Sequence, residues 1–175
     1  METFEVKRGL VKQIMEDGGL TALAGNYFDN VKDEGDDSFV GSFGILISVS
    51  GQYNEKGKLV VDVEQMKGEE LSNFLSGEGG REKAMESRQR WSGFLDVATG
   101  YSAKQRGDKA KEGAKKASKA KSAISQGRHL MKMADFDTEV VEKAEEIISE
   151  IEEALESGDF TRAASRGEKL GKLLG

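Results

Sequence analysis

Lysine and arginine side chains are concentrated in the middle of this 175-residue chain, where they could bind phosphate groups. Residues 81–132 hold fourteen Lys/Arg and five Asp/Glu, although the whole chain has a formal net charge of −6. Cations that neutralise nucleic-acid phosphates release counterions, so such binding depends steeply on salt. We therefore expect a binding protein that contacts RNA or a ribonucleoprotein. The side chains expected to make this contact are Lys104, Arg106, Lys109, Lys111, Lys115 and Lys116.

The same cations could instead meet an acidic partner within the chain. Residues 138–157 carry eight glutamates, and the short connection at 133–137 predicts an antiparallel arrangement with the basic segment. The expected neighbours are Lys132 and Arg128 with Glu139 and Glu142, Lys121 with Glu145 to Glu150, and Lys115 with Glu152 to Glu156. Exposed ion pairs contribute only ~0–1 kcal/mol each, so they would set orientation more than stability. Both interpretations remain open at this level.

Few residues in this sequence could support catalysis or hold a metal. There is no cysteine, and His129 is the single histidine, which excludes thiolate sites and any site that needs two imidazoles. The glycine runs at 17–19 and 77–80 lack the spacing of a phosphate loop. The acidic run at 33–37 lacks the ligand spacing of a calcium loop. We expect no enzymatic activity, cofactor or metal.

The N-terminal part of the chain mixes strand and helix signals. Period-two alternation predicts strands within a hairpin, and three- or four-residue steps predict an amphipathic helix. Gly44 is expected at a bulge or a close backbone approach. The predicted elements are a strand at 2–7, a helix at 10–30 kinked at Gly18-Gly19, a loop at 32–37, and a hairpin at 43–64 turning at Asn54–Gly57.

Beyond residue 80 the strand signals disappear. Helices are predicted at 81–98, 103–132 and 138–157, followed by a last helix that Asp159 caps. The basic helix has a stripe of small residues that would need close packing: Ala103, Gly107, Ala110, Ala114, Ala117, Ala120 and Ile124. We expect an α+β fold, with a small antiparallel sheet packed on helices in residues 1–100. Residues 101–175 would add the long basic helix and an acidic helical hairpin.

A second function is compatible with the C-terminal hairpin. The apolar stripe from Val140 to Leu155 could bind another protein or a second copy of the chain, as an adaptor or a homo-oligomer. No apolar run approaches the ~20 residues that a membrane span needs. We therefore expect a cytoplasmic protein without a membrane partner.

One stretch, Arg90–Gly113, resembles an uncharacterised archaeal protein family found in methanogens and halophiles. The matching positions are Phe94, Leu95, Ala98, Thr99, Gly100, Ala103, Lys104 and Arg106. That family has Asn before the Phe-Leu pair, whereas this chain has Ser92-Gly93. The resemblance extends over about residues 2–115, implies no function, and leaves the helical hairpin after residue 134 outside the family core.

Overall fold

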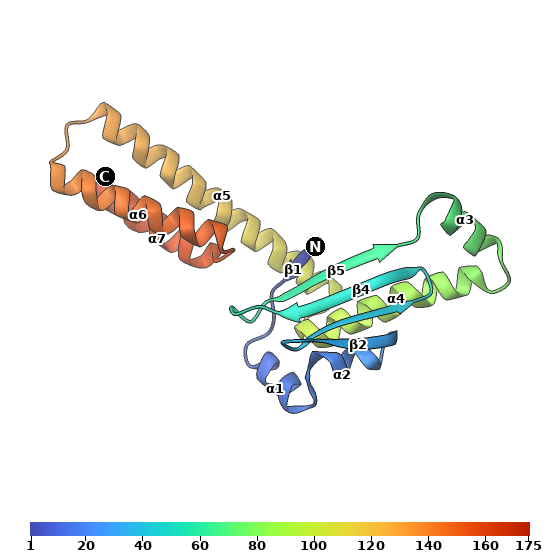
Figure 1. The fold of residues 1–175 in the computed structure, drawn as a ribbon. Coiled ribbons are helices and arrows are strands. Elements are labelled where there is room, and N and C mark those ends of the chain that lie inside the picture. The colour runs from blue at the N-terminus through green and yellow to red at the C-terminus, as the bar shows by residue number, and fades with distance from the viewer. The chain divides into compact units, whose positions relative to one another are not determined.

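The computed structural model describes all 175 residues, in an α+β fold as predicted (Figure 1). Its contacts divide the chain into two compact units, unit 1 (Met1–Gly107) and unit 2 (Asp108–Gly175), which we describe separately. Whether 1–100 and 101–175 fold as separate domains stays a prediction. No helix combines the length and the apolar character needed to cross a membrane.

The strands are β1 (Glu2–Phe4), β2 (Asp29–Gly35), β3 (Ser38–Phe43), β4 (Leu46–Tyr53) and β5 (Leu59–Gln65). The helices are α1 (Leu10–Glu16), α2 (Gly19–Gly25), α3 (Gly68–Ser76), α4 (Gly80–Thr99), α5 (Ala103–Met133), α6 (Thr138–Glu156) and α7 (Phe160–Leu174).

Unit 1 is built on one antiparallel sheet with the strand order β1-β5-β4-β3-β2. The predicted hairpin is confirmed, because β4 pairs with β5 from Tyr53↔Leu59 to Leu46↔Gln65. Its turn is held by Asn54, whose side-chain oxygen accepts hydrogen bonds from the backbone N–H groups of Lys56 and Lys58, both at 3.0 Å. The Asx-type bonds satisfy the turn locally, which explains why this element could be predicted from a short stretch.

The predicted helix at 10–30 and loop at 32–37 are wrong in part. Helix α2 ends at Gly25, and residues 29–35 form β2, the edge strand paired with β3. Asp36 and Asp37 both have a positive φ, 50° and 53°, so they form the two-residue connection between the strands. Asp tolerates this left-handed conformation better than most residues, and two such residues suit a tight hairpin. The charged run therefore continues the sheet instead of leaving it.

Gly44 confirms the expected close approach. Its φ is +54°, and a Cβ added there would lie 2.3 Å from the Ser87 Oγ of α4. The same hydroxyl accepts a hydrogen bond from the Ile45 N–H at 3.2 Å. Only glycine therefore allows the chain to approach α4 this closely. Gly44 lies in the connection between β3 and β4.

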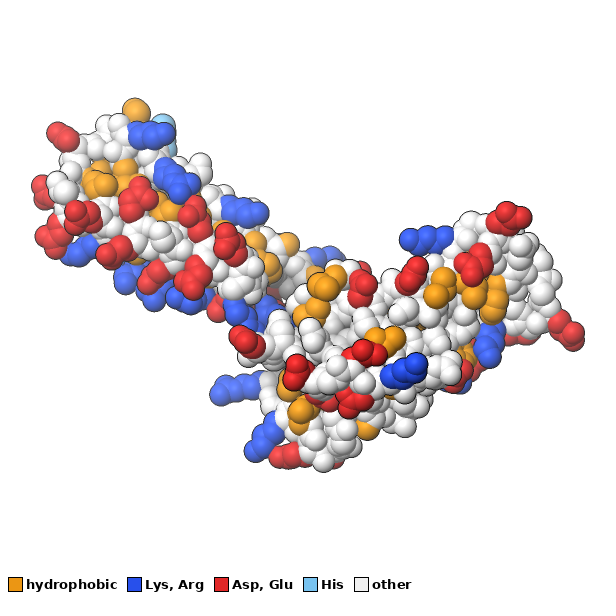
Figure 2. All heavy atoms as spheres, viewed as in Figure 1, with side chains coloured by type: hydrophobic (Ala, Val, Ile, Leu, Met, Phe, Trp, Pro, Cys, Tyr) orange, Lys and Arg blue, Asp and Glu red, His pale blue; other side chains and the backbone are white.

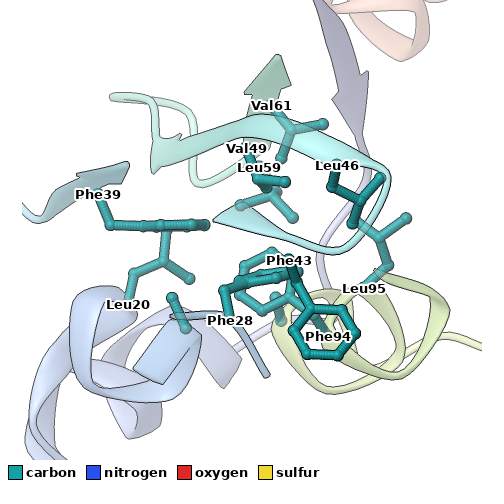
Figure 3. Close-up of a cluster of buried hydrophobic side chains, with 12 residues drawn as sticks. Leu20, Phe28, Phe39, Phe43, Leu46, Val49, Leu59, Val61, Phe94 and Leu95 are labelled. Atoms are coloured by element: carbon teal, nitrogen blue, oxygen red, sulfur yellow. The ribbon is translucent and has the colours of Figure 1, made fainter. Parts of the chain in front are cut away.

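The core of unit 1 lies between one face of the sheet and the helices (Figure 3). Phe39, Val49, Leu59 and Val61 come from the strands and are at most 2% exposed. Phe94 of α4 packs edge-on against Phe39, with ring centroids 5.3 Å apart. Full burial of such side chains contributes about 1.5–3 kcal/mol each. This cluster fixes α4 against the sheet.

Unit 2 contains the predicted antiparallel hairpin of α6 and α7. Asp159 caps α7 by accepting a hydrogen bond from the Arg162 N–H at 3.0 Å, as expected. The buried stripe of α6 meets residues of both neighbouring helices. Its members are Ala144, Ile147, Ile148, Ile151 and Ala154, and they pack with Ala120 and Ile124 of α5 and Ala163, Leu170 and Leu174 of α7.

Candidate nucleic-acid interface

Helix α5 carries the predicted binding residues, and its start is defined by local signals. Gly100 ends α4 in the left-handed conformation, with φ 72°. Ser102 then begins α5, since its backbone N–H donates to Gln105 Oε1 at 2.9 Å and its Oγ accepts from the Gln105 N–H at 3.4 Å. This reciprocal pair is a capping box. The sequence prediction of a helix from 103 is confirmed.

The buried side of α5 differs from the predicted small-residue stripe. Ala120 and Ile124 are buried, but Ala103, Ala110 and Ala114 are exposed. The predicted stripe drifts around the helix, because seven-residue steps do not return to the same angle on a 3.6-residue repeat. Only its C-terminal part faces a neighbour.

Glycines allow α5 to approach α7 closely. A Cβ at Gly113 would lie 3.1 Å from the Phe160 ring, and one at Gly127 would lie 2.9 Å from Leu170 Cδ2. On α7, a Cβ at Gly167 would lie 3.0 Å from the Ala123 Cβ. The pairing order shows that α5 and α7 run in the same direction. Close packing against a neighbour was predicted for α5, and the structure identifies α7 as a neighbour.

Arg106, predicted to contact nucleic acid, is buried in unit 1. Its side chain is 7% exposed and donates from Nη1 to the Asp96 carboxylate and the Tyr101 carbonyl, each at 2.5 Å. The guanidinium also lies over the Phe4 ring, 6.0 Å from its centroid. Because the guanidinium is buried and bonded to these partners, Arg106 is not accessible to a phosphate. We therefore leave Arg106 out of the proposed interface.

Lys109 and Lys116 lie on either side of Glu112. Lys116 Nζ is 2.7 Å from the Glu112 carboxylate, and Lys109 Nζ is 3.8 Å from it. The hydrogen bond from Lys116, followed by its charge and that of Lys109, lowers the pKa of Glu112 below its usual value. Lys116 also donates to Thr161 Oγ1 at 3.2 Å. Both lysines are thus partly neutralised by a residue of their own helix.

Lys104, Lys111 and Lys115 are exposed and form no ion pair. Within unit 2, Lys111 and Lys115 are one turn apart, so their side chains project from the same side of α5. That side lies opposite the seam formed by Ala120 and Ile124, given 100° per residue. These two ammonium groups are therefore directed to solvent.

The acidic helix pairs with α5 through Arg128 alone, and not along the helix as one of the two sequence interpretations expected. Glu150 and Glu153 of α6 pair with Arg166 and Arg162 of α7, at 3.0 Å and 4.0 Å. Arg128 of α5 pairs with Glu152 at 3.0 Å, not with Glu139 or Glu142. Lys115, Lys121 and Lys132 form no ion pair with α6. For Glu150 and Glu153, the physical reason is that α7 supplies arginine partners.

Figure 2 shows this distribution, with Asp and Glu side chains crowded over the α6–α7 hairpin of unit 2. One further pair joins α5 to the hairpin, from Lys119 Nζ to Glu168 at 2.6 Å. The hydrogen bond and charge of Lys119 lower the pKa of Glu168. The charge of Lys119 is therefore partly neutralised by Glu168 of α7.

The apolar stripe considered for an adaptor function is covered within unit 2. Ile148, Ile151 and Ala154 are at most 1% exposed, and Val140 and Leu155 at its ends are half-buried. Its partners are the residues of α5 and α7 named above. The middle of the stripe is therefore covered by helices of the same chain.

Residues 1–112 match the model of a family described as a domain of unknown function, DUF5611. The chain belongs to this family. The match to the DUF5611 domain ends within α5, so α6 and α7 lie outside it. No curated protein and no solved structure matches the chain.

The DUF5611 match includes only part of the candidate interface. Lys104, Lys109 and Lys111 fall inside it, whereas Lys115 and Lys116 follow it. No group of three or more His, Cys, Asp or Glu side chains is arranged to hold a metal ion. Sequence patterns did not reveal the burial of Arg106, because its partner Asp96 lies ten residues earlier on another helix.

Proposed function

We propose that the chain binds structured RNA, alone or in a ribonucleoprotein, through the solvent-facing lysines of α5. One observation carries the proposal: Lys111 and Lys115 stay exposed and unpaired, while Glu150 and Glu153 of α6 pair with arginines of α7. A flexible ammonium group suits contact with phosphate oxygens as a point charge. Within unit 2, Lys109 and Lys116 extend this basic surface along the helix, and Lys104 of unit 1 is a separate predicted contact.

The mode of contact that fits these residues is to the sugar–phosphate backbone, without base readout. Stacking on single-stranded bases needs exposed aromatic rings. Trp91 instead packs against Phe94 in unit 1, with ring centroids 5.9 Å apart. Double-stranded RNA is recognised mainly by its shape and its phosphates, which requires no such rings.

Filter binding of a structured RNA at two salt concentrations tests the proposal. The K111Q/K115Q variant should bind more weakly at low salt and should reduce the slope of log K against log salt by about 1.5, since two contacts are lost. A matched control is K169Q/K172Q, which removes two charges from exposed positions on α7. Equal losses in both variants, or wild-type binding that is absent or insensitive to salt, would contradict the proposal.

A further inference from the structure

A second group of cations lies on the C-terminal half of α5, outside the proposed RNA surface. It surrounds an open hollow of about 510 Å³ on unit 2. In Figure 2, Lys and Arg side chains and the pale-blue histidine gather at the end of α5 from which the chain leads to α6. The hollow is lined by Lys121, Ile124, Ser125, Arg128, His129 and Lys132.

These residues share one side of the helix. Lys121, Ser125, Arg128 and Lys132 follow one another at steps of four, three and four, which keeps their side chains in a row. Ile124, only 8% exposed, lies where this row meets the buried seam of unit 2. A packed helix surface therefore supports the row.

The hollow is positively charged and its lining includes no carboxylate. Lys121 and Lys132 are exposed and form no ion pair. Arg128 is half exposed and uses one nitrogen, Nη2, for Glu152, which leaves other N–H groups of its guanidinium for a ligand. The helix C-terminus at Met133 contributes roughly half a negative charge, which three permanent cations outweigh.

We infer that this hollow binds a chain of linked phosphates. Lys121 and Lys132 are eleven residues apart, a rise of about 16 Å along the helix, which exceeds the size of one phosphate group. Lysine supplies point charges, and arginine adds paired N–H donors to phosphate oxygens. The Ser125 hydroxyl and the His129 ring supply further hydrogen bonds. A polyphosphate and an RNA backbone share this chemistry.

The test is calorimetric titration of the full chain with inorganic tripolyphosphate, alongside filter binding of a structured RNA. The K121Q/K132Q variant should lose at least about tenfold in tripolyphosphate affinity, because two charge-assisted contacts are removed. The K169Q/K172Q variant, with the same change in charge, should change affinity by less than about twofold, because its lysines lie outside the hollow.

The RNA measurement identifies the source of the phosphates and supports the inference either way. If K121Q/K132Q weakens RNA binding too, the hollow contacts an RNA backbone; if RNA binding is retained, it takes a free oligophosphate. Wild-type protein that does not bind tripolyphosphate, or equal losses in the α7 control, would overturn the inference. The K111Q/K115Q variant separates this result from the proposed function, since it should weaken RNA binding and leave tripolyphosphate binding intact. Circular dichroism verifies that each variant folds.

Discussion

Arg106 and Asp96 form a short ion pair, 2.5 Å from Nη1 to the carboxylate, that ties the first turn of α5 to α4. The arginine side chain is 7% exposed and the aspartate 47%, so one side of the pair is buried and the other reaches water. The same guanidinium satisfies the Tyr101 carbonyl in the connection between the helices. A residue that resembles a nucleic-acid contact in the sequence is therefore structural.

Replacing Arg106 should destabilise unit 1 rather than act on RNA binding. We expect R106A to lower the free energy of unfolding by about 2–3 kcal/mol, since breaking a fully buried pair costs about 3–5 kcal/mol and Asp96 here is half exposed. R106K should recover part of the loss, because it keeps the charge but not the forked donors. Urea denaturation measures both. An R106A variant as stable as wild type, with much weaker RNA binding, would show instead that Arg106 contacts the ligand.

The glycines of α5 should respond differently to the same substitution. G127A should destabilise unit 2 by about 1–3 kcal/mol, because the added methyl would lie 2.9 Å from Leu170 Cδ2. G107A should stabilise by about 0.5–1 kcal/mol, because nothing lies within 4 Å of its Cβ and alanine favours the helix. Thermal unfolding compares the two variants. Equal effects at the two positions would contradict the close packing of α5 on α7.

Gly44 should tolerate no side chain. G44A combines a φ of +54° with a Cβ only 2.3 Å from Ser87 Oγ, so we expect a loss of about 2–3 kcal/mol. The S87A variant removes the Ser87 Oγ that G44A would contact, together with its hydrogen bond to Ile45, and is therefore the reference for the G44A/S87A double variant. Chemical denaturation of the three variants separates the contact from the backbone strain, and G44A/S87A should still be less stable than S87A. Equal stability of these two variants would show that the strain is negligible.

Tyr53 should make unit 1 sensitive to alkaline pH. Burial, followed by the charge of Asp37, raises the pKa of its hydroxyl well above the ordinary value of 10. The folded state therefore holds the proton more tightly than the unfolded state. This contribution to stability is complete below pH 10 and is lost as pH rises from there toward the folded-state pKa.

Denaturation between pH 8 and 11 measures this effect, with Y53F as the control. The Y53F variant should be less stable by about 1 kcal/mol in free energy of unfolding at pH 8, because it lacks the 2.7 Å hydrogen bond that the Tyr53 hydroxyl donates to the Ala98 carbonyl. It should also show a shallower decline above pH 10 than wild type. Identical slopes in the two proteins would show that Tyr53 does not titrate on unfolding in this range.

Local patterns in the sequence determined most of the elements. The alternation and the Asn54 turn predicted the β4–β5 hairpin, and the helix predicted from 103 begins at the local capping box of Ser102 and Gln105. Asp159 likewise marked the hairpin between α6 and α7. Each signal depends on residues within a few positions of each other, so no distant contact is needed to recognise it.

The edge strand β2 and the charge pairing were decided by tertiary structure. The charged residues 32–35 have low strand propensity, and they belong to β2 because β3 supplies their hydrogen bonds. The net charge of each helix follows from the sequence, but the helix that packs beside it does not. Arg166 of α7 forms an ion pair with Glu150, and Arg106 forms one with Asp96. The packing of the helices determines these partners, because it decides which side of each helix faces which neighbour. That selection leaves Lys111 and Lys115 in solvent.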